Sequence, residues 1–169
     1  MKKYISKISF GVIFLSIIAS IGLNSFTKKA TAHDLHVNWI TDFADLESKM
    51  KAEPRPIMID IHTKWCGPCI EMKKKVFSKQ KLINYINENY YAVYLDAERQ
   101  DKISFRGKEF TWSPNRMGGY NQIADYVTDN NTKAYPTIVI MDKSYNVKYA
   151  KPKYHTVSDM MYTLSKYNK

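Results

Sequence analysis

The residues best suited to chemistry are two cysteines, Cys66 and Cys69, separated by Gly67 and Pro68. They follow an almost continuous apolar run, Ile57–Ile61, and open a segment of helical character. A thiolate at a helix N-terminus faces free backbone N–H groups and the positive end of the helix dipole, which lower its pKa. Cys66 would hold that end, and Cys69 would lie a turn further on, more buried and less acidic. The spacing predicts an attacking thiol and a resolving thiol that carry out disulfide exchange.

A purely structural role for this pair is disfavoured, because a disulfide across two intervening residues closes too small a loop to stabilise a fold well. The chain has no other cysteine, which excludes a scaffold of several disulfides. Pro68 would sit in the first helical turn, where its missing N–H costs little. Gly67 would let a substrate backbone approach closely. Trp65 would form a flat apolar wall beside the nucleophile, or serve only in packing.

Elements that position the cysteines can be read from apolar runs and helical periodicity. The expected strands are Ile57–Ile61, Tyr91–Leu95, Thr137–Met141 and Val147–Ala150. The expected helices are Thr41–Ala52, a helix from the cysteines to about Phe77, Gln80–Asn89, Tyr120–Thr128 and a last one opened by Thr156 and Asp159 as a capping pair. Strands separated by helices imply parallel crossovers, and the last two strands would form an antiparallel hairpin. This order predicts an α/β fold.

Residues 101–119 interrupt the alternation of strands and helices. Two short runs, 103–105 and 110–112, flank a polar turn, which predicts a small hairpin inserted between core elements. Its aromatic residues would form either a partner-binding surface or the hairpin's own small core: Phe105, Phe110 and Trp112.

Three segments together resemble the thioredoxin superfamily: Ile59-Asp60-Ile61, Trp65-Cys66-Gly67-Pro68-Cys69 and Tyr135-Pro136-Thr137. The resemblance covers roughly residues 37–169. It implies a thioredoxin fold, with a central mixed sheet flanked by helices and the hairpin-like insertion around 101–119. With its basic and apolar N-terminal segment, the chain most resembles the exported, periplasmic-type thioredoxin-like thiol–disulfide oxidoreductases.

The resemblance also implies roles for residues outside the cysteine motif. Pro136 matches the family's cis-proline, which faces the cysteine pair; the alternative is a trans proline that begins a strand. Tyr135 would border the substrate groove. Asp60 matches the family's buried acid, which accepts the proton of Cys69; the alternative is an acid at a strand edge. Cytosolic members often place a lysine near this acid on the next strand. The strand Tyr91–Leu95 has none, so we expect Asp60 to be hard to ionise.

The N-terminus has the pattern of an export signal. A basic start precedes the apolar stretch Ile8–Leu23, and Ala30-Thr31-Ala32 offers a cleavage site. We therefore expect a signal peptide at residues 1–32 and a thioredoxin-like domain at residues 33–169, in the periplasm or otherwise exported. Because Lys28 and Lys29 lie between the apolar stretch and the cleavage site, the alternative is an uncleaved segment that tethers the protein to the membrane.

Charge excludes one class of partner. Residues 1–32 hold five lysines and no acid, so the formal charge falls from +10 to +5 without them. The only dense basic run, Lys73–Lys75, has the character of a solvated helix face, and nucleic-acid binding is not expected. The expected partners are exported client proteins with disulfides and a membrane-bound electron donor, and the chain would be a monomer.

The expected reaction is reduction of client disulfides through a mixed disulfide, with no cofactor beyond the redox-active Cys66–Cys69 disulfide. The alternatives are a disulfide oxidase or isomerase, and a non-catalytic partner-binding module. A zinc site using both cysteines and His62 lacks a fourth ligand. A copper site at a mature N-terminus would need His33 and His36. Neither metal is expected.

Overall fold

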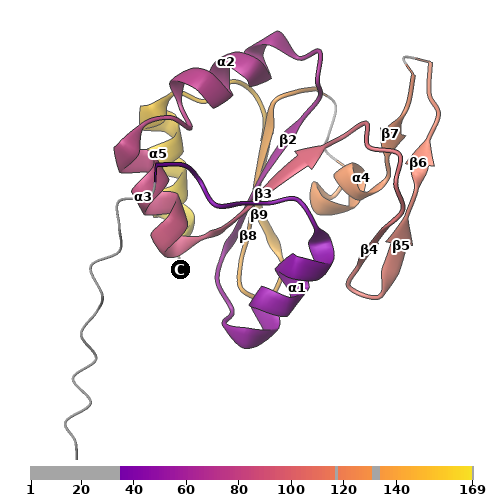
Figure 1. Ribbon diagram of the computed structural model, residues 1–169, viewed down its shortest axis with the longest axis horizontal. Coiled ribbons are helices and arrows are strands. Elements are labelled where there is room, and N and C mark those ends of the chain that lie inside the picture. The colour runs from indigo at the N-terminus through magenta and orange to yellow at the C-terminus, as the bar shows by residue number, and fades with distance from the viewer. Residues whose placement is uncertain (1–34, 117, 131–133, 169) are drawn as a thin grey trace, which may run out of the picture. The chain divides into compact units, whose positions relative to one another are not determined.

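The computed structural model describes residues 35–116, 118–130 and 134–168 (Figure 1). The expected signal peptide, with its cleavage site and His33, lies outside these residues. Within the described ranges, no helix is both long enough and apolar enough to cross a membrane.

A five-stranded mixed sheet forms the centre of the domain, with strand order β1-β3-β2-β8-β9. Its strands are β1 (Trp39–Ile40), β2 (Ile57–His62), β3 (Tyr91–Asp96), β8 (Thr137–Met141) and β9 (Val147–Pro152). The helices are α1 (Phe43–Ala52), α2 (Gly67–Lys75), α3 (Gln80–Asn89), α4 (Ile123–Val127) and α5 (Val157–Tyr167). Two small antiparallel pairs lie between β3 and α4: β4 (Ile103–Phe105) with β5 (Lys108–Phe110), and β6 (Trp112–Ser113) with β7 (Tyr120–Asn121). This is the thioredoxin fold expected from the sequence.

The direction of β8 differs from the expectation. Strand β2 runs parallel to β3, as predicted, and so does β1, which the sequence did not predict, but β8 is antiparallel to β2. The crossover rule fails because α4 has only five residues and is about 7–8 Å long. A helix of that length does not return the chain along a six-residue strand of about 20 Å. Strand β8 therefore begins at the edge of the sheet where β2 and β3 end.

Each face of the sheet carries its own core. Side chains alternate along a strand, so Ile57, Ile59 and Ile61 of β2 point to the face covered by α1 and α4. Met58 points to the opposite face, against α2, α3 and α5. Figure 1 shows these two groups of helices on opposite sides of the sheet. Because β2 is buried along its whole length, any polar side chain on it is removed from solvent.

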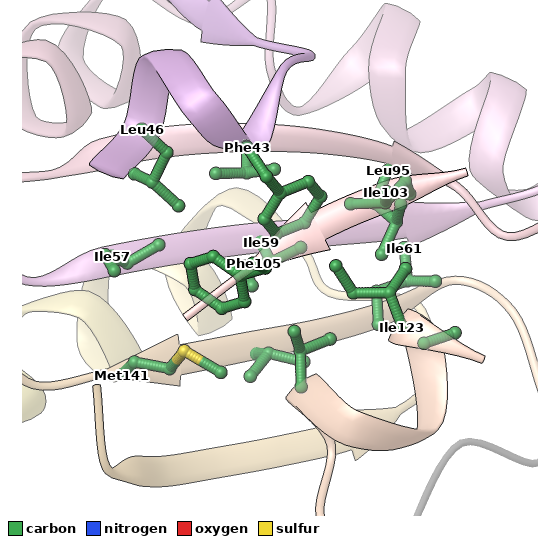
Figure 2. Packing of buried hydrophobic residues seen from close by; sticks show 14 of the residues in the cluster. Phe43, Leu46, Ile57, Ile59, Ile61, Leu95, Ile103, Phe105, Ile123 and Met141 are labelled. Carbon is green, nitrogen blue, oxygen red and sulfur yellow. The ribbon is translucent and has the colours of Figure 1, made fainter. Parts of the chain in front are cut away.

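A hairpin forms in the insertion, but its second strand is 108–110 and not the expected 110–112, because Trp112 pairs with Asn121 instead. For Phe105 and Phe110, neither a partner-binding surface nor a separate hairpin core is correct. Phe105 and Phe110 are buried in the main core, and Phe105 packs edge-to-face on Phe43 of α1 at 4.9 Å between ring centroids (Figure 2). Trp112 is half-buried, and a side chain at Gly119 would overlap its indole ring. The insertion thus extends the domain core instead of forming a separate one.

Helix boundaries differ from the expectation at two N-termini. Helix α1 is capped by Asp42, whose carboxylate accepts from the N–H of Ala44, and not by Thr41. Helix α4 starts at Ile123, because the expected first residues of this helix form β7 and the side chain of Asn121 accepts from the N–H of Ile123.

The N-terminus of α5 agrees with the sequence. Thr156 and Asp159 form the predicted reciprocal capping box.

Candidate active site

Three loops meet at one edge of the sheet. Because β2 and β3 are parallel and β8 is antiparallel to them, the chain leaves β2 and β3 and enters β8 at the same edge. The segment after β2 carries the cysteines, the segment after β3 carries Glu98, and the segment before β8 carries Tyr135 and Pro136. Two contacts of Trp65 join these loops. Its indole N–H donates to Glu98 over 2.8 Å, and its ring meets the Tyr135 ring edge-to-face at 6.3 Å between centroids.

Cys66 and Cys69 form a disulfide at the start of α2, with their Cα atoms 5.3 Å apart. Cys66 is the N-cap of the helix, and its Sγ accepts a hydrogen bond of 3.2 Å from the N–H of Cys69. Gly67 and Pro68 form the first turn, as expected. A sulfur in the N-cap position satisfies one of the helix's free N–H groups, which is the arrangement that stabilises a thiolate.

The predicted difference in burial between the cysteines is wrong for the oxidised pair. Cys66 is 3% exposed and Cys69 is 4% exposed, because each sulfur of a disulfide covers the other. What separates the two residues is their place in the helix, since Cys66 caps it and Cys69 lies inside the first turn.

Trp65 is 69% exposed, although its indole N–H is bonded to Glu98. The backbone of Glu98 is fixed in turn, because its N–H donates to the Asp96 carboxylate over 3.0 Å. A large exposed aromatic side chain fixed in this way offers a rigid apolar surface next to Cys66. No pattern in the sequence singles out Glu98. Only the meeting of the β2 and β3 edges brings it to Trp65.

The Tyr135–Pro136 peptide bond is cis, and Pro136 is buried at the entry to β8. Tyr135 is half-buried beside Trp65, and burial raises the pKa of its hydroxyl above the usual value. The loop before β8 therefore stands next to the cysteine segment.

Asp60 lies in the middle of β2 and is 2% exposed. Its neighbours in the sheet are Tyr94 of β3 and Ile138 of β8. Burial raises the pKa of Asp60 to about 7, although the positive charge of Lys73 acts in the opposite direction. The Oδ1 atom forms no hydrogen bond within the described residues. The carboxyl group is consequently set to change its charge near neutral pH.

A small set of polar side chains lies between Asp60 and the surface. His62 stacks on Tyr94 with ring centroids 3.6 Å apart, and burial lowers the pKa of its imidazole. The ammonium of Lys73 lies 4.7 Å from the centre of the Tyr94 ring. A hollow of about 360 Å³ is lined by these three side chains and by Cys69. The sequence pattern identified Asp60 but not these neighbours, because they come from three different elements.

The sulfurs of Cys66 and Cys69 are bonded to each other. Across residues 35–116, 118–130 and 134–168, no three His, Cys, Asp or Glu side chains are grouped as metal ligands would be.

A disulfide at the N-terminus of a helix, on a thioredoxin fold, defines a thiol–disulfide oxidoreductase. The sequence profile of the thioredoxin-like family matches residues 38–143, and the chain belongs to that family. It is similar to the thiol:disulfide interchange protein DsbD of Campylobacter jejuni (strain RM1221), with 28% identity over 89 residues. That match covers 52% of this chain and only 16% of the relative.

Solved structures share the fold. The DsbH oxidoreductase is similar over 82% of this chain and 95% of its own, with a TM-score of 0.54 and 12% identity. The C-terminal domain of Neisseria meningitidis DsbD, in its oxidised form, is similar over 78% of this chain and 99% of its own, with a TM-score of 0.50 and 14% identity.

Proposed function

We propose that this protein reduces disulfide bonds of exported client proteins, with Cys66 as the nucleophile and Cys69 as the resolving thiol. The observation that carries the proposal is the place of Cys66 at the N-cap of α2, with its sulfur bonded to the N–H of Cys69. In the reduced protein the same helix terminus would stabilise a thiolate on Cys66 and leave Cys69 as the thiol.

In the first step the Cys66 thiolate attacks one sulfur of the client disulfide, so that a mixed disulfide forms and the other client sulfur leaves as a thiolate. Cys69 then gives up its proton and attacks the Cys66 sulfur. The Cys66–Cys69 disulfide forms, and the second client sulfur leaves. Two electrons pass from the dithiol to the client, and the client takes up two protons.

Asp60 accepts the proton that Cys69 gives up. Its pKa of about 7 supports this role, because a base that titrates near the working pH both takes and releases a proton readily. In the oxidised protein Cys69 carries no proton, and Asp60 Oδ1 has no hydrogen bond within the described residues, so this oxygen is open to the proton of the reduced protein.

Clients bind against the exposed apolar surface around Cys66. Trp65 and Tyr135 form its walls, and Pro136 places the backbone of the loop before β8 beside the client. Gly67 and Pro68 form its floor. A Cβ atom at Gly67 would meet no other atom within 4 Å, which leaves the space above the helix terminus for a client backbone.

The few contacts of the Cys66 sulfur in the oxidised pair support reduction as the direction of electron flow. Within the described residues its sulfur accepts one hydrogen bond, from the N–H of Cys69. A strongly stabilised thiolate would favour the dithiol and make the disulfide oxidising, and about 30 mV corresponds to roughly 1.4 kcal/mol for this two-electron couple. With a single neutral donor, the disulfide is the more stable state and the dithiol is a reductant.

Residues 1–32 direct the protein out of the cytosol, and a membrane-bound donor returns electrons to the Cys66–Cys69 pair. A similar relative is named a thiol:disulfide interchange protein, which agrees with electron exchange between proteins. Mass spectrometry of protein recovered from the cell envelope tests the processing. A mature chain that begins at His33 is expected, and a full-length chain in the membrane fraction would indicate an uncleaved anchor.

Two assays test the function. The wild type should reduce the disulfides of insulin, and Cys66→Ser should abolish this; a wild type without activity would indicate a non-catalytic binding module. Equilibration with glutathione tests the direction. The pair should remain a disulfide in mostly oxidised glutathione, whereas a dithiol that persists there would indicate an oxidase or isomerase.

A further inference from the structure

Lys73 lies on the same face of α2 as the resolving cysteine. Cys69 and Lys73 are four residues apart, which places them one above the other on one side of a helix. Both side chains line the hollow of about 360 Å³ between α2 and the sheet. The ammonium of Lys73 lies over the Tyr94 ring, at 4.7 Å from its centre.

Asp60 lies on the side of the sheet that α2 covers. Met58 and Asp60 are two residues apart on β2 and share one side of the sheet, and Met58 packs in the core beneath α2. Tyr94, on which the Lys73 ammonium rests, is the residue directly opposite Asp60 in the parallel pair of β2 and β3. Lys73 is thus held by an aromatic ring that adjoins the buried carboxyl group.

Two other lysines line the hollow, Lys64 and Lys74, and the ammonium of Lys64 lies 3.9 Å from the Asp96 carboxylate. Of the three lysines, it is Lys73 that lowers the pKa of Asp60. On β2, burial lowers the pKa of His62 and favours the neutral imidazole. On β3 the neighbours are Tyr94 and Asp96, and burial, with the charges of Asp60 and Asp96, raises the pKa of the Tyr94 hydroxyl. Strand β8 has only apolar residues and a threonine in this region. From α2, Lys73 supplies the opposing cation.

We propose that Lys73 is a positioning residue for the resolving step, whose ammonium keeps the Asp60 carboxylate charged near neutral pH so that it can take the proton of Cys69. The proton transfer in this inference rests on the proposed function. The effect of Lys73 on the pKa of Asp60 does not depend on it. Lys73 acts through Asp60 and touches neither the client nor the reacting sulfurs.

Because Lys73 is exposed, its effect on the pKa of Asp60 should depend on salt. The residue is exposed on its outer side, so dissolved ions screen its charge over about 8 Å at physiological ionic strength. The influence of Lys73 on Asp60 should therefore weaken as salt is added.

The direct test is a ¹³C NMR titration of the Asp60 carboxyl group in the oxidised protein, in which the cysteines do not titrate. Asp60→Asn identifies the signal. In Lys73→Met, which keeps the aliphatic stem, the Asp60 midpoint should rise by about half a pH unit or more, because the opposing charge is gone. Lys73→Arg should keep the wild-type midpoint. Lys75→Met, which removes a charge from the same helix outside the lining of the hollow, should leave the midpoint unchanged. Added salt should raise the midpoint in the wild type more than in Lys73→Met.

Kinetics of the resolving step give the second test. The rate at which the mixed disulfide is released should show its pH midpoint displaced upward in Lys73→Met, by the same amount as the Asp60 signal. An Asp60 midpoint that is the same in Lys73→Met and the wild type would overturn the inference. An Asp60 midpoint that moves in a protein without reductase activity would refute the proposed function and leave the effect of Lys73 established.

Discussion

Replacing Asp60 by asparagine should change the pH dependence of stability in a direction set by the burial of this carboxyl group. An unfolded chain ionises an aspartate near pH 4, whereas the folded protein holds the pKa of Asp60 at about 7. Between these values the folded state keeps a proton that the unfolded state has released. Stability from the protonated carboxyl is therefore fully present below about pH 4 and is lost as the pH rises through about 7.

The size of the effect follows from the difference in pKa. About three units at 1.36 kcal/mol each give a loss of roughly 4 kcal/mol between pH 4 and pH 8 for the oxidised wild type. Asparagine has nearly the same shape and no charge to lose. The stability difference between Asp60→Asn and the wild type should therefore grow in favour of the variant by roughly this amount over the same range. Urea unfolding of both proteins, followed at pH values from 4 to 8, measures it.

Asparagine in the core also changes the free energy of unfolding by an amount that does not depend on pH. Comparing the two proteins at two pH values removes this constant amount. Asp142→Asn gives a control of opposite sign, because hydrogen bonds from Asn146 and Ser144 and the nearby Lys148 hold the pKa of Asp142 at about 2 despite partial burial. That variant should lose stability relative to the wild type above pH 4 and match it near pH 2. A difference between Asp60→Asn and the wild type that is the same at pH 4 and pH 8 would refute the raised pKa of Asp60.

Three further predictions concern the site and its frame. In the reduced protein Cys66 should react with iodoacetamide faster than Cys69, and Cys69→Ser should accumulate mixed disulfides with clients; accumulation in Cys66→Ser would reverse the assignment. Glu98→Ala should raise the KM for a protein disulfide by about fivefold, about 1 kcal/mol, by releasing the Trp65 indole, and leave the reduction of a small disulfide unchanged. Thr156→Ala should lower the free energy of unfolding by about 1 kcal/mol in urea titrations, through loss of the helix cap.

The strands of the central sheet were predictable because they are short apolar runs with clear ends. Ile57–Ile61 and Thr137–Met141 could be identified in this way, and β8 occupies the expected residues. What failed was the direction of β8, which depends on the length of the connection and not on the strand itself. The two-residue strand β1 was missed, because two residues carry no periodic pattern.

The insertion shows a second limit of reading the sequence. Phe105 and Phe110 were recognisable as a hairpin pattern, yet the pattern contains no information on what the hairpin packs against. The structure places both in the main core, where Phe105 meets Phe43 from a distant part of the chain. Contacts between segments far apart in sequence, such as this one and the bond between Trp65 and Glu98, leave no local signal.

In the proposed mechanism, burial of Asp60 links the stability of the fold to the transfer of the Cys69 proton. An ordinary thiol, with a pKa near 8.5, gives its proton to an ordinary aspartate at a cost of about 6 kcal/mol. Raising the pKa of the acceptor to about 7 reduces that cost to about 2 kcal/mol. The roughly 4 kcal/mol gained for the proton transfer equals the stability that the folded protein loses above neutral pH, because both follow from the same displaced pKa. A charge from Lys73 that lowers this pKa therefore stabilises the fold and weakens the base at once. The pKa of Asp60 near 7 is a balance between the stability of the fold and the strength of the base. It is set by the burial of β2 in the sheet and by Lys73 on α2.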